Sequence, residues 1–182
     1  ETGYDLAKVG RYKFNKKLHM KNRIVGQIPS EDIVDTETGE ILAEAGKAIT
    51  KDQAIAIQNA AIPYVWIQTE ERVEKVLSNL MVDLSAYVSF DPEEVGITEL
   101  VYYPVLKDIL EKAGDDEEEL KAELRRNVHE LVPKCITKED ILASINYNMH
   151  LEYGIGVKDD IDHLGNRRSL AVGDLLQNQY RI

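Results

Sequence analysis

The chain has 182 residues, of which 43% are hydrophobic and 30% charged, with a formal net charge of −11. These values are typical of a soluble globular protein with one domain or two small ones. No apolar run approaches the roughly 18 residues that span a bilayer, and no signal-peptide core is present, so we expect a cytoplasmic protein with no membrane partner. Cys135 is the only cysteine and cannot form an internal disulfide, which fits a reducing compartment.

The charge is unevenly distributed along the chain. Residues 1–22 have a net charge of +4, residues 23–133 of −14, and residues 134–182 of −1. Nucleic-acid binding depends mainly on Lys and Arg at phosphates, so the total charge by itself argues against it. The asymmetry predicts a separate acidic module within a less acidic frame. At the start of this frame, the basic and aromatic stretch Tyr4–Asn15 is typical of a solvated strand or turn.

Residues 23–69 predict a hairpin, a helix and a strand. The segment Asp35–Gly39 separates two short apolar runs and suits a tight reversal between strands. Thr50 followed by Gln53 is a helix-start signature, and the helix should end before Pro63. The β-rich run that follows, over 64–67, completes the unit.

Residues 70–133 are predicted to be mainly helical. The stretch Glu71–Leu77 is compatible with a short helix, and Pro104 suits the first turn of a helix that ends at Gly114. The acidic run 115–119 favours the start of another helix over a metal site, because carboxylates complement the dipole at a helix N-terminus. That helix is expected to carry the apolar residues Leu120, Leu124, Val128 and Leu131.

A last clear helix follows Pro133. Thr137–Asp140 predicts its cap, and four apolar residues then recur at helical spacing: Ile141, Leu142, Ile145 and Met149. Gly154 and Gly156 indicate a loop, and the tail can be helical around 172–177. Together these elements predict an α+β fold.

No catalytic or metal site assembles from residue spacing. The four histidines and one cysteine do not form a zinc pattern. Asp159, Asp160 and Asp162 lack the glycine and the distal glutamate of a calcium loop. Asp162 and Arg167 flank Gly165, and a carboxylate with a guanidinium can contact the edge of an unstacked base. An internal salt bridge that shapes the turn is the alternative, and spacing alone favours it.

Three blocks, in order, resemble the β subunit of bacterial DNA-directed RNA polymerase. Asp159–Arg168 with the following 171–182 is similar to the segment where the chain leaves the lobe domain and returns to the protrusion. Tyr4–Asn15 resembles the end of the lobe, and Thr137–Ala143 the helix that normally follows soon after it. The chain is therefore identified as a member of this family.

The resemblance also gives a domain organisation. In shorter family members the first two blocks are joined by a short connection, so residues 23–133 are expected to be a lineage-specific insertion. Within it, 32–46 is similar to the small β–β′ modules of polymerase insertions. We expect residues 1–22 to be a lobe segment, and residues 134–182 to form the lobe helix and the return toward the protrusion. The two flanking parts should pack together at the base of the insertion.

The family further implies sites and partners. Asp162 and Arg167 fall where β subunits hold a guanine of the non-template DNA strand just downstream of the active centre. Ser169–Ala171 departs from the family's Ile/Leu-Arg-Ser pattern, so a basic contact there is lost or displaced. The expected partners are the β′, α, ω and sigma subunits and DNA. The intact enzyme is a nucleotidyltransferase whose magnesium is held by another subunit, so no catalytic, cofactor or metal residue is expected here.

The insertion has two candidate roles. It is either a passive surface spacer or an interaction module that docks a transcription factor, or a basic segment of one, through the helix that begins at Asp115. The alternative for the whole chain is a stand-alone protein-interaction domain.

Overall fold

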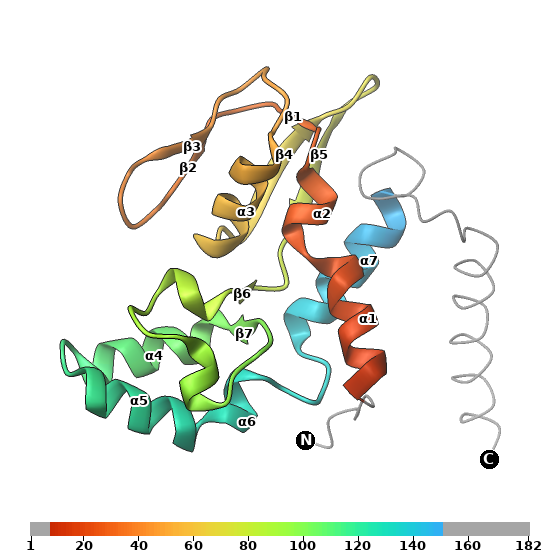
Figure 1. Cartoon of the computed structure of the whole chain (residues 1–182). Helices are drawn as coiled ribbons and strands as arrows, with labels where there is room; N and C mark the ends of the chain where they lie inside the picture. The colour runs from red at the N-terminus through yellow and green to blue at the C-terminus, as the bar shows by residue number, and fades with distance from the viewer. Residues whose placement is uncertain (1–7, 151–182) are drawn as a thin grey trace, which may run out of the picture.

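The structure is a computed structural model and describes residues 8–150, which begin with helix α1 (Lys8–Leu18) and helix α2 (Met20–Ile24) (Figure 1). The expectation of a strand or turn over Tyr4–Asn15 is wrong from Lys8 onward. Lysine, arginine and leucine are good helix formers, and the basic last turn of α1 complements the helix dipole. Within residues 8–150 no helix is long and apolar enough to cross a membrane.

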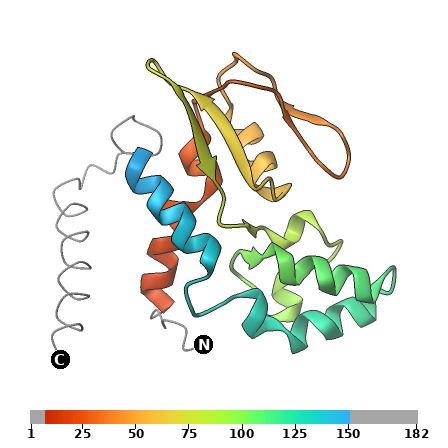
Figure 2. The same ribbon diagram turned by 180° about the vertical axis from the view of Figure 1, so that it is seen from behind.

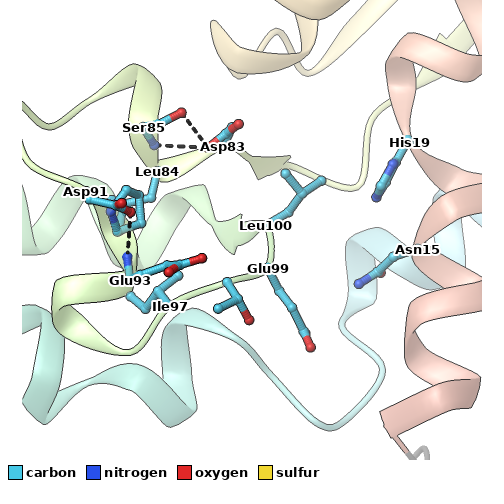
Figure 3. Close-up of a pocket in the computed structure, with 12 residues that line it drawn as sticks. Asn15, His19, Asp83, Leu84, Ser85, Asp91, Glu93, Ile97, Glu99 and Leu100 are labelled. Atoms are coloured by element: carbon cyan, nitrogen blue, oxygen red, sulfur yellow. Dashed lines mark hydrogen bonds between the residues drawn. The ribbon is translucent and has the colours of Figure 1, made fainter.

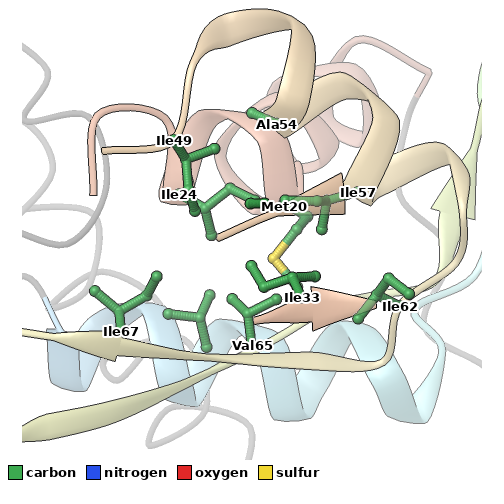
Figure 4. Close-up of a cluster of buried hydrophobic side chains, with 11 residues drawn as sticks. Met20, Ile24, Ile33, Ile49, Ala54, Ile57, Ile62, Val65 and Ile67 are labelled. Atoms are coloured by element: carbon green, nitrogen blue, oxygen red, sulfur yellow. The ribbon is translucent and has the colours of Figure 1, made fainter. Parts of the chain in front are cut away.

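A three-stranded antiparallel sheet with strand order β1-β4-β5 forms the first core. Its strands are β1 (Ile28–Pro29), β4 (Tyr64–Gln68) and β5 (Val73–Leu77). Alternate residues of β4 point inward, and α2 and α3 (Lys51–Asn59) cover that face of the sheet (Figures 1 and 4). We call residues 20–77 the sheet module.

Strand β5 corrects the prediction of a helix over Glu71–Leu77. Each of its five residues pairs with a residue of β4, from Val73 opposite Gln68 to Leu77 opposite Tyr64. Val76 is fully buried in the core. A short run that mixes charged and β-branched residues suits either structure, and here the neighbouring strand β4 decided between them.

The predicted hairpin and helix cap of the sheet module are confirmed. Strands β2 (Ile33–Val34) and β3 (Ile41–Ala43) are antiparallel, and Gly39 at φ 73° donates its N–H to the Asp35 carbonyl at 2.8 Å. Thr50 and Gln53 form the reciprocal capping box at the start of α3.

The second core lies in what we call the helical module, residues 81–132. Its elements are β6 (Met81–Val82), the 3₁₀ turns η1 (Leu84–Ala86) and η2 (Pro92–Val95), β7 (Val101–Tyr102), α4 (Tyr103–Ala113), α5 (Glu117–Arg126) and α6 (Val128–Leu131). Strands β6 and β7 pair in antiparallel fashion. Leu106, Ile109 and Leu124 of α4 and α5 pack in its core.

The helix expected to run from Asp115 through Leu131 is two helices. Asp116 caps α5 by accepting hydrogen bonds from the N–H groups of Glu118 and Glu119. At Asn127 the helix breaks, where the side-chain amide donates to the Glu123 carbonyl at 2.8 Å and competes with the backbone pattern. Leu124 and Leu131 nevertheless both reach the core, because the chain resumes as α6.

Helix α7 (Lys138–His150) has the predicted cap, in which Thr137 accepts from the Asp140 N–H at 3.1 Å. Its apolar residues at helical spacing, Ile141, Leu142, Ile145 and Met149, are each more than half exposed among the described residues. The buried side instead carries Asp140, Ala143 and His150. This side contacts α1 and β5, so α7 connects the N-terminal helix to the edge of the sheet (Figures 1 and 2).

Candidate functional site

The predicted base-contacting residues Asp162 and Arg167 lie outside the described residues. Helix α7 ends at His150, twelve residues before Asp162. The described residues precede this segment in the chain. They contain two polar sites of their own.

The first site is a buried cluster that fixes α7 to the sheet module, which we call the polar joint: Arg23, Glu74, Asn146 and His150. Arg23 is only 1% exposed, which is unusual for a guanidinium and requires hydrogen-bond partners. Its guanidinium donates to the Leu77 carbonyl at 2.8 Å and to Asn146 Oδ1 at 2.6 Å.

Asn146 caps the open edge of strand β5. Its side-chain oxygen accepts from the Leu77 N–H at 3.0 Å, and its amide donates to the Lys75 carbonyl at 2.7 Å. An edge strand presents unpaired backbone groups that other chains can join. A single asparagine of α7 occupies two of these groups and so attaches the helix to the sheet.

The electrostatics of the polar joint favour a neutral histidine beside a charged arginine. Burial lowers the pKa of Arg23 to about 10, so its guanidinium stays charged at neutral pH. Burial and then the charge of Arg23 lower the pKa of His150. Its Nδ1 lies 3.4 Å from the Arg23 guanidinium and its Nε2 3.2 Å from Glu74, an arrangement that suits a neutral ring with the proton on Nε2.

The second site, which we call the acidic cleft, is a cavity of about 390 Å³ between α1 and the 83–100 segment (Figure 3). Its lining residues are Asn15, His19, Asp83, Leu84, Ser85, Asp91, Pro92, Glu93, Ile97, Thr98, Glu99 and Leu100. Figure 3 shows Asn15 and His19 pointing across the space toward Leu100 and Glu99. The cleft therefore lies between the N-terminal helix α1 and the helical module.

The four carboxylates of the acidic cleft differ in their partners. Asp83 and Asp91 cap the 3₁₀ turns η1 and η2 by accepting from backbone N–H groups at 3.0 Å. The side chains of Glu93 and Glu99 have no hydrogen-bond or ion-pair partner among the described residues. Among the side chains that the structure describes, no lysine or arginine lines the cavity.

The wall formed by Asn15 of α1 and by His19, which lies between α1 and α2, is uncharged at these two residues. Burial, and then the neighbouring Lys21, lower the pKa of His19 to about 4, so the imidazole is neutral at neutral pH. Asn15 Oδ1 is buried without a hydrogen-bond partner in the described structure. The cleft thus combines four carboxylates with the uncharged side chains of Asn15 and His19, and the Ser85 hydroxyl donates to Asp83 at 2.8 Å.

Within residues 8–150 no group of three or more His, Cys, Asp or Glu side chains is placed to hold a metal ion. The acidic start of α5 is used structurally. Asp116 caps the helix, and Glu117 forms an ion pair with Lys121 at 3.0 Å.

Sequence reasoning did not identify either polar site. Arg23 is more than 120 residues from both Asn146 and His150, and no local pattern marks a buried arginine. The residues of the acidic cleft come from two distant segments as well. The only signal in the sequence was the excess of acidic residues between 23 and 133, which does not show where in the fold the cleft lies.

Comparison with known proteins identifies related chains. Residues 95–169 match the family model described as RNA polymerase Rpb2, domain 2. Over 179 residues, or 98% of this chain, it is 54% identical to DNA-directed RNA polymerase subunit beta of Clostridium botulinum strain Loch Maree. The identity is 53% to that subunit of Clostridium acetobutylicum and 50% to that of Clostridium tetani, with the same coverage. The chain spans 14% of the length of these relatives.

Proposed function

We propose that this chain, which belongs to the bacterial RNA polymerase β-subunit family, forms part of the lobe of that subunit in an enzyme that transcribes DNA. The observation that carries the proposal is the identity to β subunits along nearly the whole chain. In this enzyme the chain assembles with β′, α, ω and sigma subunits. RNA synthesis depends on magnesium held by another subunit. The lobe contacts the DNA and helps to position it.

Within that role, Asp162 and Arg167 contact a guanine of the non-template strand. The matched family segment extends through residue 169 and includes both residues. The Asp162 carboxylate accepts from N–H groups on the guanine edge, while the Arg167 guanidinium donates to its acceptors. Other walls of this pocket come from parts of the subunit beyond this chain.

Residues 23–133 serve as an interaction module on the lobe surface. Two observations support this role: the segment contains most of both hydrophobic cores, and it carries the acidic excess of the chain. A passive spacer requires neither a defined cavity nor unpaired carboxylates.

The test of the base contact is Asp162→Ala in reconstituted polymerase. We expect roughly a tenfold or greater loss of preference for guanine at the non-template position, because one good base contact contributes about 1–3 kcal/mol of discrimination. The measurement is binding to paired DNA scaffolds with guanine or adenine at that position. Asp159→Ala, which removes the same charge three residues upstream, is the control. Unchanged guanine preference in Asp162→Ala would show that the assignment is wrong.

A further inference from the structure

We infer that the outer side of α7 is a docking surface inside the polymerase, covered by an apolar segment of the same β subunit that lies outside these 182 residues. We call this side the α7 stripe: Ile141, Leu142, Ile145 and Met149. The inference rests on the proposed place of the chain in a β subunit, and it adds the surface and the kind of partner. The chain spans 14% of the length of its relatives, so most of such a subunit is available to supply the segment.

The α7 stripe concentrates the exposed apolar side chains of the structure. Among the described residues, five large hydrophobic side chains are more than half exposed, and four of them form the α7 stripe. Ile141, Ile145 and Met149 follow one another at four-residue spacing, so with Leu142 beside them they form a row about 12 Å long on one side of the helix. Contiguous exposed apolar surface marks interaction sites on soluble proteins, whereas single exposed residues do not.

The buried polar side of α7 prevents the helix from turning the α7 stripe inward. Near the start of the helix, Asp140 accepts from Asn79 Nδ2 at 3.2 Å, and both side chains are buried. Further along, Asn146 bonds to two backbone groups of β5, and at the end His150 Nε2 lies 3.2 Å from Glu74. Rotation of α7 would leave these buried groups without partners, which is costly. The α7 stripe can therefore be covered only from outside the described residues.

The chemistry of the α7 stripe selects an apolar and permanent partner. Between Asp140 and His150, the sequence of α7 contains no charged residue. Nucleic acid is thereby excluded, because it is bound mainly by Lys and Arg at phosphates. Permanent interfaces are more apolar than transient ones, and a factor that dissociates would leave this surface exposed to water. The α7 stripe therefore fits a contact that stays in place once the subunit has folded.

Covalent connection favours a segment of the β subunit itself over a separate subunit. A tethered segment is present at a high effective concentration and avoids the association cost of a free chain. The identity to β subunits covers 98% of this chain but only 14% of theirs, so such segments are joined to α7 through the same backbone. The α7 stripe is thus a contact between the lobe and another part of its own subunit.

The experiment measures oxidation of methionine by hydrogen peroxide, read by peptide mass spectrometry. It compares the isolated 182-residue chain with polymerase that is reconstituted, without sigma, from a full β subunit containing this chain. Met149 is 63% exposed, whereas Met20 and Met81 are buried and serve as internal references. We expect Met149 to oxidise much faster than both references in the isolated chain, and about tenfold or more slower in the polymerase. A photo-crosslinker at position 145 should join a β peptide from outside this chain.

Two substitutions form a matched pair for the same measurement. Ile145 and Ile41 are 54% and 55% exposed, so Ile145→Gln and Ile41→Gln make the same chemical change at equal exposure. In the polymerase, Ile145→Gln should raise the oxidation rate of Met149 by about tenfold or more, because loss of a buried isoleucine contact shifts the docking equilibrium by that order. Ile41→Gln, which lies in β3, should change that rate less than about twofold.

Three results overturn the inference: equally fast oxidation of Met149 in the polymerase, protection of Met149 already in the isolated chain, or a crosslink to another subunit or to a second copy of β. The second result would assign the α7 stripe to residues 151–182 of this chain.

Failure of this inference is distinguishable from failure of the proposed base contact, because guanine preference is measured on the same enzyme. Fast oxidation of Met149 in a polymerase whose guanine preference falls in Asp162→Ala refutes only the docking surface. Protection of Met149 with an unchanged preference in Asp162→Ala refutes only the base contact.

Discussion

The sheet module and the helical module differ in where they place their charged groups. The joint between the sheet module and α7 buries Arg23 and His150, with Glu74 and Asn146 alongside. In the helical module, every buried residue between 81 and 132 is hydrophobic, and its many carboxylates stay at the surface or in the acidic cleft. Buried polar groups attach the sheet module to α7, whereas apolar packing alone fills the core of the helical module.

Charged groups have different effects in the two modules: buried ones fix the structure, and surface ones stay accessible. Buried polar groups contribute to stability only while all partners are in place, because removal of one leaves the others unpaired in a low-dielectric interior. Surface carboxylates contribute little to stability and remain available to solvent or to a partner. We therefore expect the polar joint to determine how α7 is oriented and the helical module to carry the free charge.

The largest expected effects come from one substitution in each module. Arg23→Ala should lower the free energy of unfolding by about 3 kcal/mol or more, because it leaves Asn146 and the Leu77 carbonyl short of donors. Leu124→Ala should cost about 3 kcal/mol through lost burial and a cavity. Trp66, the only tryptophan, lies in β4 and reports on the sheet module, while far-UV circular dichroism reports on both.

In urea unfolding, Arg23→Ala should shift the fluorescence transition of Trp66, and Leu124→Ala should shift mainly the circular-dichroism transition. Identical shifts of both signals in both variants would show that the two modules unfold as one unit. Different shifts of the two signals would show that the two modules unfold separately.

A smaller effect is expected from pH. The pKa of His19 is lowered to about 4 and that of His150 is also lowered, so the unfolded chain binds protons more readily than the folded one. The contribution of the two histidines to the free energy of unfolding is therefore fully present above about pH 6.5, the pKa of histidine in the unfolded chain. It is lost as the pH falls toward 4, by roughly 1–2 kcal/mol between pH 7.5 and 5. Urea unfolding at the two pH values measures it. A double variant His19→Asn, His150→Gln should lose most of this dependence, and an unchanged slope would assign it to other groups.

The smallest effect is expected on the outer side of α7. Ile145→Gln should change the free energy of unfolding of this chain by less than about 0.5 kcal/mol, because Ile145 is 54% exposed among the described residues. Ala143→Gln on the buried side of the same helix is the contrasting variant and should destabilise strongly. A large cost for Ile145→Gln in chemical unfolding would mean that residues beyond 150 cover this side.

Local chemistry in the sequence determined several elements. Three predicted features depend on neighbours within a few residues, and all are confirmed: the turn at Asp35–Gly39, the capping box of Thr50 and Gln53, and Pro104 in the first turn of α4. The α+β class and the resemblance to polymerase β subunits were likewise accessible without coordinates, because motif order and turn chemistry are local properties. The boundaries of the insertion and the roles of Asp162 and Arg167 stay predictions.

Tertiary structure decided what local patterns leave open. Residues 73–77 became a strand because β4 offered a partner, and the apolar spacing of Ile141, Leu142, Ile145 and Met149 did not mark the buried side of α7. Instead, α7 turns Asn146 and His150 inward, where they meet Arg23 from more than 120 residues away. Hydrogen-bond satisfaction between distant segments is not encoded in the spacing of either one. The polar joint and the acidic cleft exist only because the folded chain brings those segments together.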